Sequence, residues 1–154
     1  MTNPAVDYDT IIVGGGPSGA TAANDLARRG HSVLLLERGF RIKPCGGAIP
    51  PCLLAEFDIP EHLLKARIRS ARMVSPRGDS VDMPIDGTFV GMVDRDEFDP
   101  WLRDRAEESG ATVVPGVFKT LCYEGDLVSL TYQTKDDNPR NVTVTARSVI
   151  GADG

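Results

Sequence analysis

The chain has 154 residues, of which 41% are hydrophobic and 25% charged, a composition typical of an ordinary globular protein of about one domain. Seventeen Lys and Arg against 22 Asp and Glu leave a formal net charge of −5, so we expect no nucleic-acid partner. No apolar run approaches the roughly 18 residues of a membrane-spanning helix, and the first residues lack the basic and apolar regions of a signal peptide.

The first part of the chain predicts a βαβ unit over residues 8–37. A β-branched run at 9–13 predicts a buried strand, and the Ala- and Leu-rich segment 18–29 predicts a helix that ends at Gly30. The apolar run at 32–37 is too short for a helix and predicts a second strand. A strand, a helix and a strand in this order place the two strands parallel to each other.

The middle of the chain predicts a long loop and then paired strands. The loop, rich in Gly and Pro, spans residues 39–52 and is followed by a short helix expected around 53–57. Further strands are expected at 70–74, 80–83 and 89–93, the first two paired around a Pro-Arg-Gly-Asp turn. We expect residues 70–93 to begin a substrate-binding portion.

The second half predicts one long helix followed by strands. The helix is expected at 94–109, with its apolar side chains on one face and Pro100 inside it. The strands are expected, in chain order, at 111–114, 117–123, 127–133, 142–146 and 149–152. Residues 117–146 are expected to be antiparallel and to belong to the substrate-binding portion, whereas 148–153 returns to the first domain.

The two ends of the chain differ in character. Met1 is typical of a natural start, but the last residues form an apolar strand that runs into a glycine turn. Domains usually end in exposed polar residues, so we expect residues 1–154 to be the N-terminal part of a longer protein, truncated at the C-terminus.

Cysteines and histidines do not suggest a metal site. Cys45, Cys52 and Cys122 form no Cys-x-x-Cys pair, and His31 and His62 stand apart in the sequence. Three cysteines at irregular spacing argue against a disulfide framework and against a zinc site. We therefore expect no metal and a reducing, cytoplasmic compartment.

Residues Gly14–Gly19 fit the pattern G-x-G-x-x-G, directly after a predicted strand and directly before a predicted helix. Gly14 allows the tight turn, Gly16 lets the backbone approach a pyrophosphate, and Gly19 lets the helix pack closely on the strand. The start of the helix, at Pro17 and Ser18, offers a partial positive charge to an anion, together with the free N–H groups of the residues around the proline. The pattern therefore predicts a dinucleotide site.

The second strand ends in Glu37, 23 positions after Gly14, which is close to the spacing of the carboxylate that hydrogen-bonds a ribose hydroxyl. A carboxylate here would repel a 2′-phosphate, so NADP is disfavoured at this site and FAD and NAD remain. An NAD-binding half would continue with another βα unit soon after Glu37. The long loop that follows instead favours FAD.

Three segments resemble motifs of the glutathione-reductase-like and hydroxylase-like flavoproteins. They are Glu37–Arg38, the R-x-x-F-D-x-x-L segment Arg95–Leu102, and the G-A-D-G turn Gly151–Gly154. The resemblance implies that Asp153 and Gly154 contact the ribityl and pyrophosphate region of FAD. It also places Arg38 and Arg95 among the FAD-binding residues, although unaided the sequence favours a surface helix charge for Arg95.

The loop Lys43–Pro51 and the following Glu56–Pro60 resemble the geranylgeranyl reductase family of chlorophyll and bacteriochlorophyll synthesis. The stretches at 72–76, 91–95 and 102–107 strengthen this resemblance, which runs over nearly all of the chain. Together with the βαβ unit it implies an α/β fold: a Rossmann-like FAD-binding domain with an inserted, partly antiparallel β portion of a substrate domain.

The resemblance implies an FAD enzyme of photosynthetic pigment synthesis that saturates double bonds of a geranylgeranyl chain to give phytyl, with NADPH as electron donor. The substrate is geranylgeranylated (bacterio)chlorophyll or geranylgeranyl diphosphate. Such an apolar substrate suggests peripheral association with the photosynthetic membrane. The bacterial branch of the family fits better than the plant branch.

Cys45 is the one candidate for the reaction itself. Next to Gly46 and Gly47, which leave room for a flavin ring, its thiol is expected to donate a proton or to shape the pocket. The alternative is a small hydrophobic loop residue, which is the common role of a free cysteine.

Three other functions remain open on the sequence. A flavin monooxygenase of the aromatic hydroxylase type would share Gly14–Gly19, Glu37, Arg95 and Asp153. An archaeal-type reductase would act on prenyl ether lipids. A chain of this length alone would be a non-catalytic, truncated FAD-binding fragment.

Overall fold

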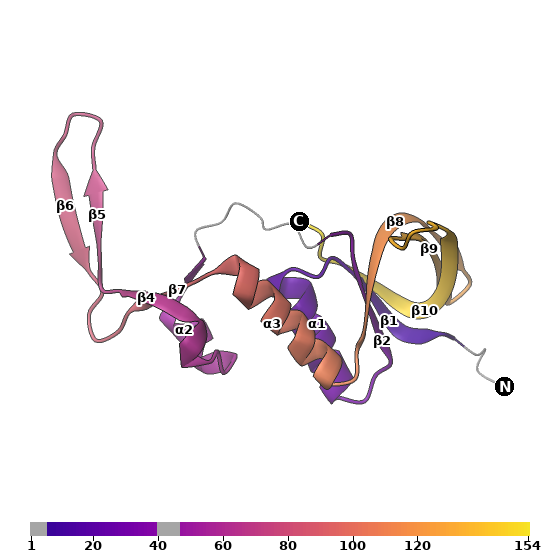
Figure 1. The fold of residues 1–154 in the computed structure, drawn as a ribbon. Coiled ribbons are helices and arrows are strands. Elements are labelled where there is room, and N and C mark those ends of the chain that lie inside the picture. Colours follow the sequence, from indigo (N-terminus) through magenta and orange to yellow (C-terminus); the bar gives the residue numbers. More distant parts are fainter. Residues whose placement is uncertain (1–5, 40–46) are drawn as a thin grey trace. The chain divides into compact units, whose positions relative to one another are not determined.

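A computed structural model describes residues 6–39 and 47–154 (Figure 1). The chain divides into two units, one made of residues 1–41 and 99–154 and the other of residues 42–98, and each is described by itself. Among the described residues, no helix combines the length and the apolar character needed to cross a membrane.

The first unit begins with the predicted βαβ arrangement. It consists of β1 (Tyr8–Val13), α1 (Pro17–Arg28) and β2 (Val33–Glu37), and β1 and β2 pair in parallel. The helix starts with a proline at its first position, where a missing N–H is not needed, and it stops just before Gly30, whose φ of +85° favours glycine. The prediction of a parallel βαβ unit is therefore confirmed.

Three further strands close this unit into a barrel. They are β8 (Thr112–Glu124), β9 (Leu127–Thr134) and β10 (Asn141–Gly151), and the barrel order is β1-β10-β9-β8-β2. The first part of β8 pairs in parallel with β2 and the rest antiparallel with β9, while β10 passes from β9 to a parallel pairing with β1. Buried side chains fill the core: Ile11, Leu34, Leu36, Leu130, Tyr132 and Ala146.

Both long strands correct the sequence prediction, which divided each of them in two. The expected break at Pro115–Gly116 lies inside β8, at the point where the strand changes partner from β2 to β9. A proline is tolerated there because the regular ladder is interrupted. The expected segments 142–146 and 149–152 are likewise one strand, β10, since its two halves pair with different neighbours. Residues 117–146, expected in a substrate-binding portion, thus share one sheet with β1 and β2.

The second unit contains small antiparallel sheets. β7 (Val90–Val93) lies between β3 (Ala48–Ile49) and β4 (Leu64–Ile68), and β5 (Ser70–Val74) pairs with β6 (Ser80–Pro84) in the hairpin that the sequence predicted. The remaining elements are the short helix α2 (Pro51–Glu56) and a 3-10 helix (Glu61–Leu63). The prediction missed β3, which has only two residues, and β4, whose alternating apolar and charged residues do fit a strand and which pairs antiparallel with β7.

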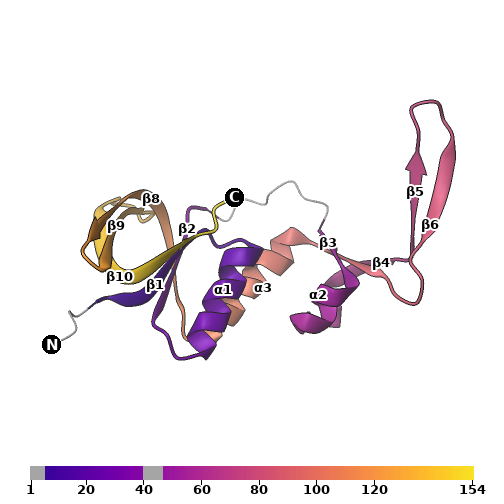
Figure 2. The same ribbon diagram turned by 180° about the vertical axis from the view of Figure 1, so that it is seen from behind.

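The helix α3 (Arg95–Glu108) begins where the sequence predicted, since the carbonyl oxygen of Asp94 accepts hydrogen bonds from the N–H groups of Glu97 and Phe98. Figures 1 and 2 show α1 and α3 side by side, on one side of β1 and β2. Near the end of α3, the hydroxyl of Ser109 donates to Oδ1 of Asn24 on α1 at 2.9 Å. Both Ser109 and Asn24 belong to the first unit.

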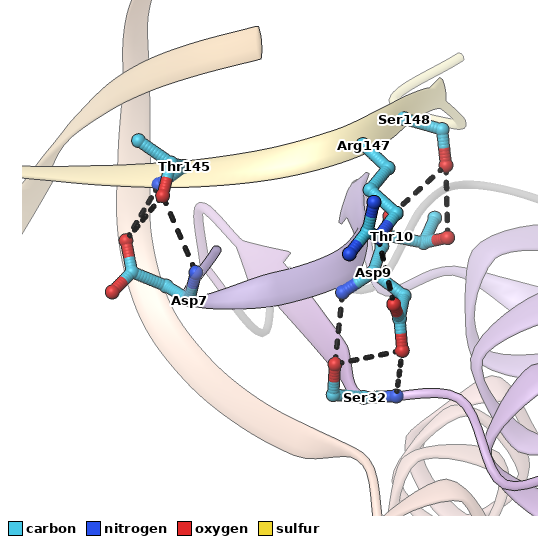
Figure 3. A network of polar contacts seen from close by, with 7 residues as sticks. All are labelled: Asp7, Asp9, Thr10, Ser32, Thr145, Arg147 and Ser148. Atoms are coloured by element: carbon cyan, nitrogen blue, oxygen red, sulfur yellow. Dashed lines mark hydrogen bonds and ion pairs between the residues drawn. The ribbon is translucent and has the colours of Figure 1, made fainter. Parts of the chain in front are cut away.

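Polar contacts join the amino ends of β1 and β2 to the middle of β10 (Figure 3). The Asp9 carboxylate accepts from both the N–H and the hydroxyl of Ser32 at 2.9 Å, and the Asp7 carboxylate accepts from the N–H of Thr145 at 2.7 Å and from its hydroxyl at 2.9 Å. These hydrogen bonds lower the pKa of both carboxyls, the backbone donor having the larger effect in each case. A weaker contribution to Asp9 comes from the guanidinium of Arg147.

We expect the Asp9→Asn variant to lose stability in a pH-dependent way. Because folding lowers the pKa of Asp9 from its ordinary 3.8, its stabilising effect is present above that value and is lost as the pH falls through the folded-state pKa. Denaturant unfolding at several pH values should therefore show a wild-type advantage at pH 7 that shrinks below about pH 4. Asp126→Asn, in the turn between β8 and β9, is the charge-matched control. An advantage that does not change with pH would contradict the assignment.

We expect Gly116→Ala to destabilise the barrel. A Cβ at Gly116 would lie 2.7 Å from Cδ1 of Leu36 and from Cδ2 of Tyr132, both in the core. Overpacking of this kind reduces the free energy of unfolding by about 1–3 kcal/mol. Gly151→Ala in β10 is the matched control, because a Cβ there meets nothing within 4 Å. Equal midpoints of urea unfolding for the two variants would refute the expectation.

Candidate cofactor-binding site

The carboxyl ends of three strands meet at one edge of the first unit. β1 is parallel to both β2 and β10, so all three end at this edge. The N–H of Gly14 donates to the carbonyl oxygen of Leu36 at 2.7 Å, and the N–H of Ala152 donates to that of Val13 at 2.7 Å. The turn after β1 therefore lies between the end of β2 and the segment after β10. In α/β sheets, ligands bind at the carboxyl ends of the strands.

Two glycines of the G-x-G-x-x-G pattern allow close approach of the backbone. Gly14 has a φ of +107°, and a Cβ on it would lie 2.5 Å from the carbonyl oxygen of Ala152. A Cβ on Gly19 would lie only 1.9 Å from the carbonyl oxygen of Gly14. Any residue other than glycine at these two positions would therefore force α1 farther from the end of β1. These are the packing roles that the sequence predicted for the first and third glycines.

Gly16 differs from its neighbours because it borders open space. It is the N-cap of α1 with a φ of −75°, and a Cβ on it would meet nothing within 4 Å. No side chain caps the start of α1, and Ser18 in its first turn is exposed. Helix N-termini of this kind attract phosphate through their N–H groups and their partial positive charge. The residues present therefore fit a dinucleotide diphosphate at Gly16.

Glu37 lies at this edge as predicted, and it also holds the glycine turn. One carboxylate oxygen accepts from the N–H of Gly15 at 2.6 Å and the other from the N–H of Gly39 at 2.8 Å. Each carboxylate oxygen has two lone pairs, so these bonds leave acceptor capacity for a ribose hydroxyl. Arg38 follows directly and is exposed.

The sequence did not single out Arg103 as a site residue, yet it reaches the glycine turn. It lies on α3, is buried, and donates from Nη1 to the carbonyl oxygen of Gly15 at 3.0 Å. Its position beside Leu102 in an amphipathic helix offers no signal that the side chain enters the site. Only the packing of α3 against α1 brings it there.

The remaining predicted residues fall into three groups. Asp153 and Gly154 follow β10, and the Cα of Asp153 lies 2.7 Å from the position of a Cβ on Gly14. Gly47 and Arg95 lie in the second unit, where the Gly47 carbonyl accepts from the N–H of Val93 at 2.9 Å. Cys45 and Gly46 lie outside the described residues, so their roles stay predictions.

Comparison with known proteins supports the predicted FAD cofactor. Residues 9–48 match the family described as FAD dependent oxidoreductase. This span contains α1, β2 and all of β1 except Tyr8, and so includes the whole of the glycine turn and the Glu37 carboxylate that holds it.

Two curated relatives carry the resemblance over most of the chain. It is 51% identical to the geranylgeranyl diphosphate reductase of Rhodobacter capsulatus, covering 96% of the chain and 37% of the relative. It is 38% identical to the chloroplastic geranylgeranyl diphosphate reductase of Arabidopsis thaliana, covering 93% of the chain and 33% of the relative. The chain thus spans about a third of the length of these relatives. The predicted resemblance to the geranylgeranyl reductases is confirmed.

Solved structures confirm the fold class. A geranylgeranyl bacteriochlorophyll reductase-like protein from Thermoplasma acidophilum superposes with a TM-score of 0.84 at 28% identity, covering 96% of this chain and 39% of the other. The flavin-dependent brominase Bmp2, as a triple mutant, gives a TM-score of 0.81 at 20% identity, covering 96% and 39%. The second likeness shows the fold alone.

The two glycines at the ends of the Gly16–Gly19 segment should respond in opposite ways to alanine. Gly19→Ala forces its Cβ onto the carbonyl of Gly14 and should lower the free energy of unfolding by about 1–3 kcal/mol or more. Gly16→Ala fills open space and should change it by no more than about 0.5 kcal/mol. Urea unfolding of both variants checks this. Similar destabilisation by both would mean that Gly16 does not face open space.

Proposed function

Because the chain is a relative of the geranylgeranyl reductases, we propose that the protein is an FAD-dependent oxidoreductase that reduces carbon–carbon double bonds of a geranylgeranyl chain. The observation that carries this proposal is the 51% identity to a geranylgeranyl diphosphate reductase over 96% of the chain. The geometry of the glycine turn supports it, because the turn is formed and open at Gly16.

The adenine-bearing half of FAD would be held by the residues at the strand ends. The N–H groups of Gly16, Ser18 and Gly19 at the start of α1 would donate to the diphosphate, and Glu37 would accept from the ribose hydroxyls. Asp153 and Gly154 enter the same edge from β10 and are proposed to contact the ribityl and pyrophosphate region. Further proposed contacts come from Arg38, Gly46, Gly47 and Arg95.

An isolated alkene is a poor hydride acceptor, so its reduction needs a strong donor, close positioning and the exclusion of water. FAD, when bound and reduced, supplies the hydride to one alkene carbon. A proton goes to the other carbon, and Cys45 is the candidate donor. NADPH is the proposed source of electrons: for each double bond it would transfer one hydride to the oxidised flavin and leave as NADP⁺, and solvent would replace the proton that Cys45 gives up.

The proposed substrates are geranylgeranyl diphosphate and geranylgeranylated (bacterio)chlorophyll, both of which carry the same apolar chain. Reduction of three of its four double bonds gives phytyl. The protein would act from the cytoplasmic side, peripherally at the photosynthetic membrane, where such a chain resides. The 51% identity to the Rhodobacter relative, against 38% to the Arabidopsis one, supports a bacterial pathway.

Mass spectrometry of the product tests this function. Full-length protein with FAD and NADPH should add two hydrogens for each double bond reduced, six in all for phytyl. Added oxygen or halogen in place of hydrogen would overturn the proposal in favour of the monooxygenase or halogenase chemistry of related folds. A full-length protein that is folded but colourless and takes up no FAD would also overturn it.

The Gly16→Val variant connects that activity with the glycine turn. Its branched side chain would occupy the open side of Gly16 where the diphosphate approaches, while its extended backbone conformation suits valine. We expect folded protein, by circular dichroism, with FAD binding and product formation abolished. Thr143→Val on the exposed side of β10 is the control and should keep both. FAD binding by Gly16→Val at the wild-type level would place the diphosphate elsewhere.

A further inference from the structure

Arg103 is a buried cation that the proposed chemistry does not use. Its residue is only 8% exposed, and its Nη1 donates to the carbonyl oxygen of Gly15, 88 positions away in the chain, at 3.0 Å. Burial of a guanidinium is unfavourable unless hydrogen bonds compensate for its lost hydration. Buried positions of an amphipathic helix are usually apolar, so a buried arginine in contact with the glycine turn suggests a functional role.

The two polar groups of Gly15 are held by side chains of opposite charge. The N–H donates to the Glu37 carboxylate at 2.6 Å, and the carbonyl accepts from the Arg103 guanidinium. A Cβ on Gly15 would lie 3.0 Å from Cβ of Glu37 and 3.2 Å from Cδ of Arg103. Both side chains therefore lie against the backbone here, and the orientation of the peptide planes on either side of Gly15 is determined by two charge-assisted hydrogen bonds.

The orientation of the Gly15 carbonyl determines the orientation of the next N–H. The carbonyl of Gly15 and the N–H of Gly16 belong to one peptide plane, and in a trans peptide they point in opposite directions. The described residues contain no cis peptide bond. When Arg103 holds the carbonyl, the N–H of Gly16 points away from Arg103. A cation on the carbonyl also polarises the peptide and strengthens its N–H as a donor.

We propose that Arg103 is a positioning residue for the FAD diphosphate. By holding the Gly15 carbonyl, it directs the N–H of Gly16 toward the phosphate that approaches at the open side of the turn. This proposal rests on the proposed binding of FAD. It assigns a function in cofactor binding to the part of α3 that lies in the first unit, and it does not require Arg103 to touch the cofactor.

The test compares FAD binding by Arg103→Met with that by a matched variant in the full-length protein. Met keeps an unbranched stem of similar packing but removes the donor and the charge. We expect the dissociation constant for FAD, from quenching of flavin fluorescence, to rise about tenfold or more, the range for a lost hydrogen bond to a charged group. Arg28→Met, exposed in the last turn of α1, removes the same charge and should stay within about threefold of wild type.

A second readout separates positioning from a purely structural role. At saturating FAD, the ³¹P resonances of the bound diphosphate should shift in Arg103→Met relative to wild type and to Arg28→Met. A residue that only stabilised the fold would lower the unfolding temperature of the protein and leave these resonances in place. Unchanged ³¹P resonances in Arg103→Met at saturating FAD would overturn the proposal, whether or not the dissociation constant rises.

Arg103→Lys separates the hydrogen bond from the charge and remains informative if Arg103→Met does not fold. The shorter lysine keeps the positive charge but does not reach the Gly15 carbonyl as the guanidinium does. We expect its dissociation constant to rise by threefold or more. Wild-type affinity in Arg103→Lys would show that charge alone matters and would overturn the positioning role. The failure of this inference can be told apart from the failure of the proposed function. If the wild-type protein binds no FAD, the proposed function is refuted as well. If the wild-type protein reduces the alkene and the Arg103 variants bind FAD with wild-type affinity, only this inference is refuted.

Discussion

The close approach of backbone to backbone at Gly14 is the constraint on which the site depends. The turn after β1 passes between the end of β2 and the segment after β10, with hydrogen bonds of 2.7 Å from Gly14 to Leu36 and from Ala152 to Val13. A side chain at Gly14 would collide with Ala152, and one at Gly19 would collide with Gly14. Because α1 can come this near only with glycine at both positions, its N-terminus is brought to the edge where the parallel strands end.

Local charge matters more at this edge than the net charge of −5. Glu37 and Arg103, which carry opposite charges, hydrogen-bond the N–H and the carbonyl oxygen of Gly15. The start of α1 adds its partial positive charge and its N–H groups toward the open side. An acidic protein can therefore bind a diphosphate here, since the field that the phosphate meets comes from the nearest oriented groups.

The sequence predicted the parts of the fold that depend on neighbouring residues. The β-branched and apolar runs of β1 and β2, the helix between them and its glycine stop were all correct within a residue or two. The hairpin of β5 and β6 was also correct. The prediction failed where a strand continues only because it changes partner, as β8 does at Pro115–Gly116. It also missed β4, although Leu64–Ile68 alternates apolar and charged residues as a strand does.

For the cofactor site, the sequence by itself determined the positions of the turn, the helix start and the carboxylate at Glu37, because glycine spacing and strand length act over a few residues. Only the tertiary structure decided that Asp153 lies beside Gly14, that Glu37 holds Gly15, and that Arg103 holds it from the other side. The physical reason is distance along the chain. Gly15 and Arg103 are 88 positions apart in the chain, and the residues next to Arg103 in the sequence do not indicate that it hydrogen-bonds Gly15.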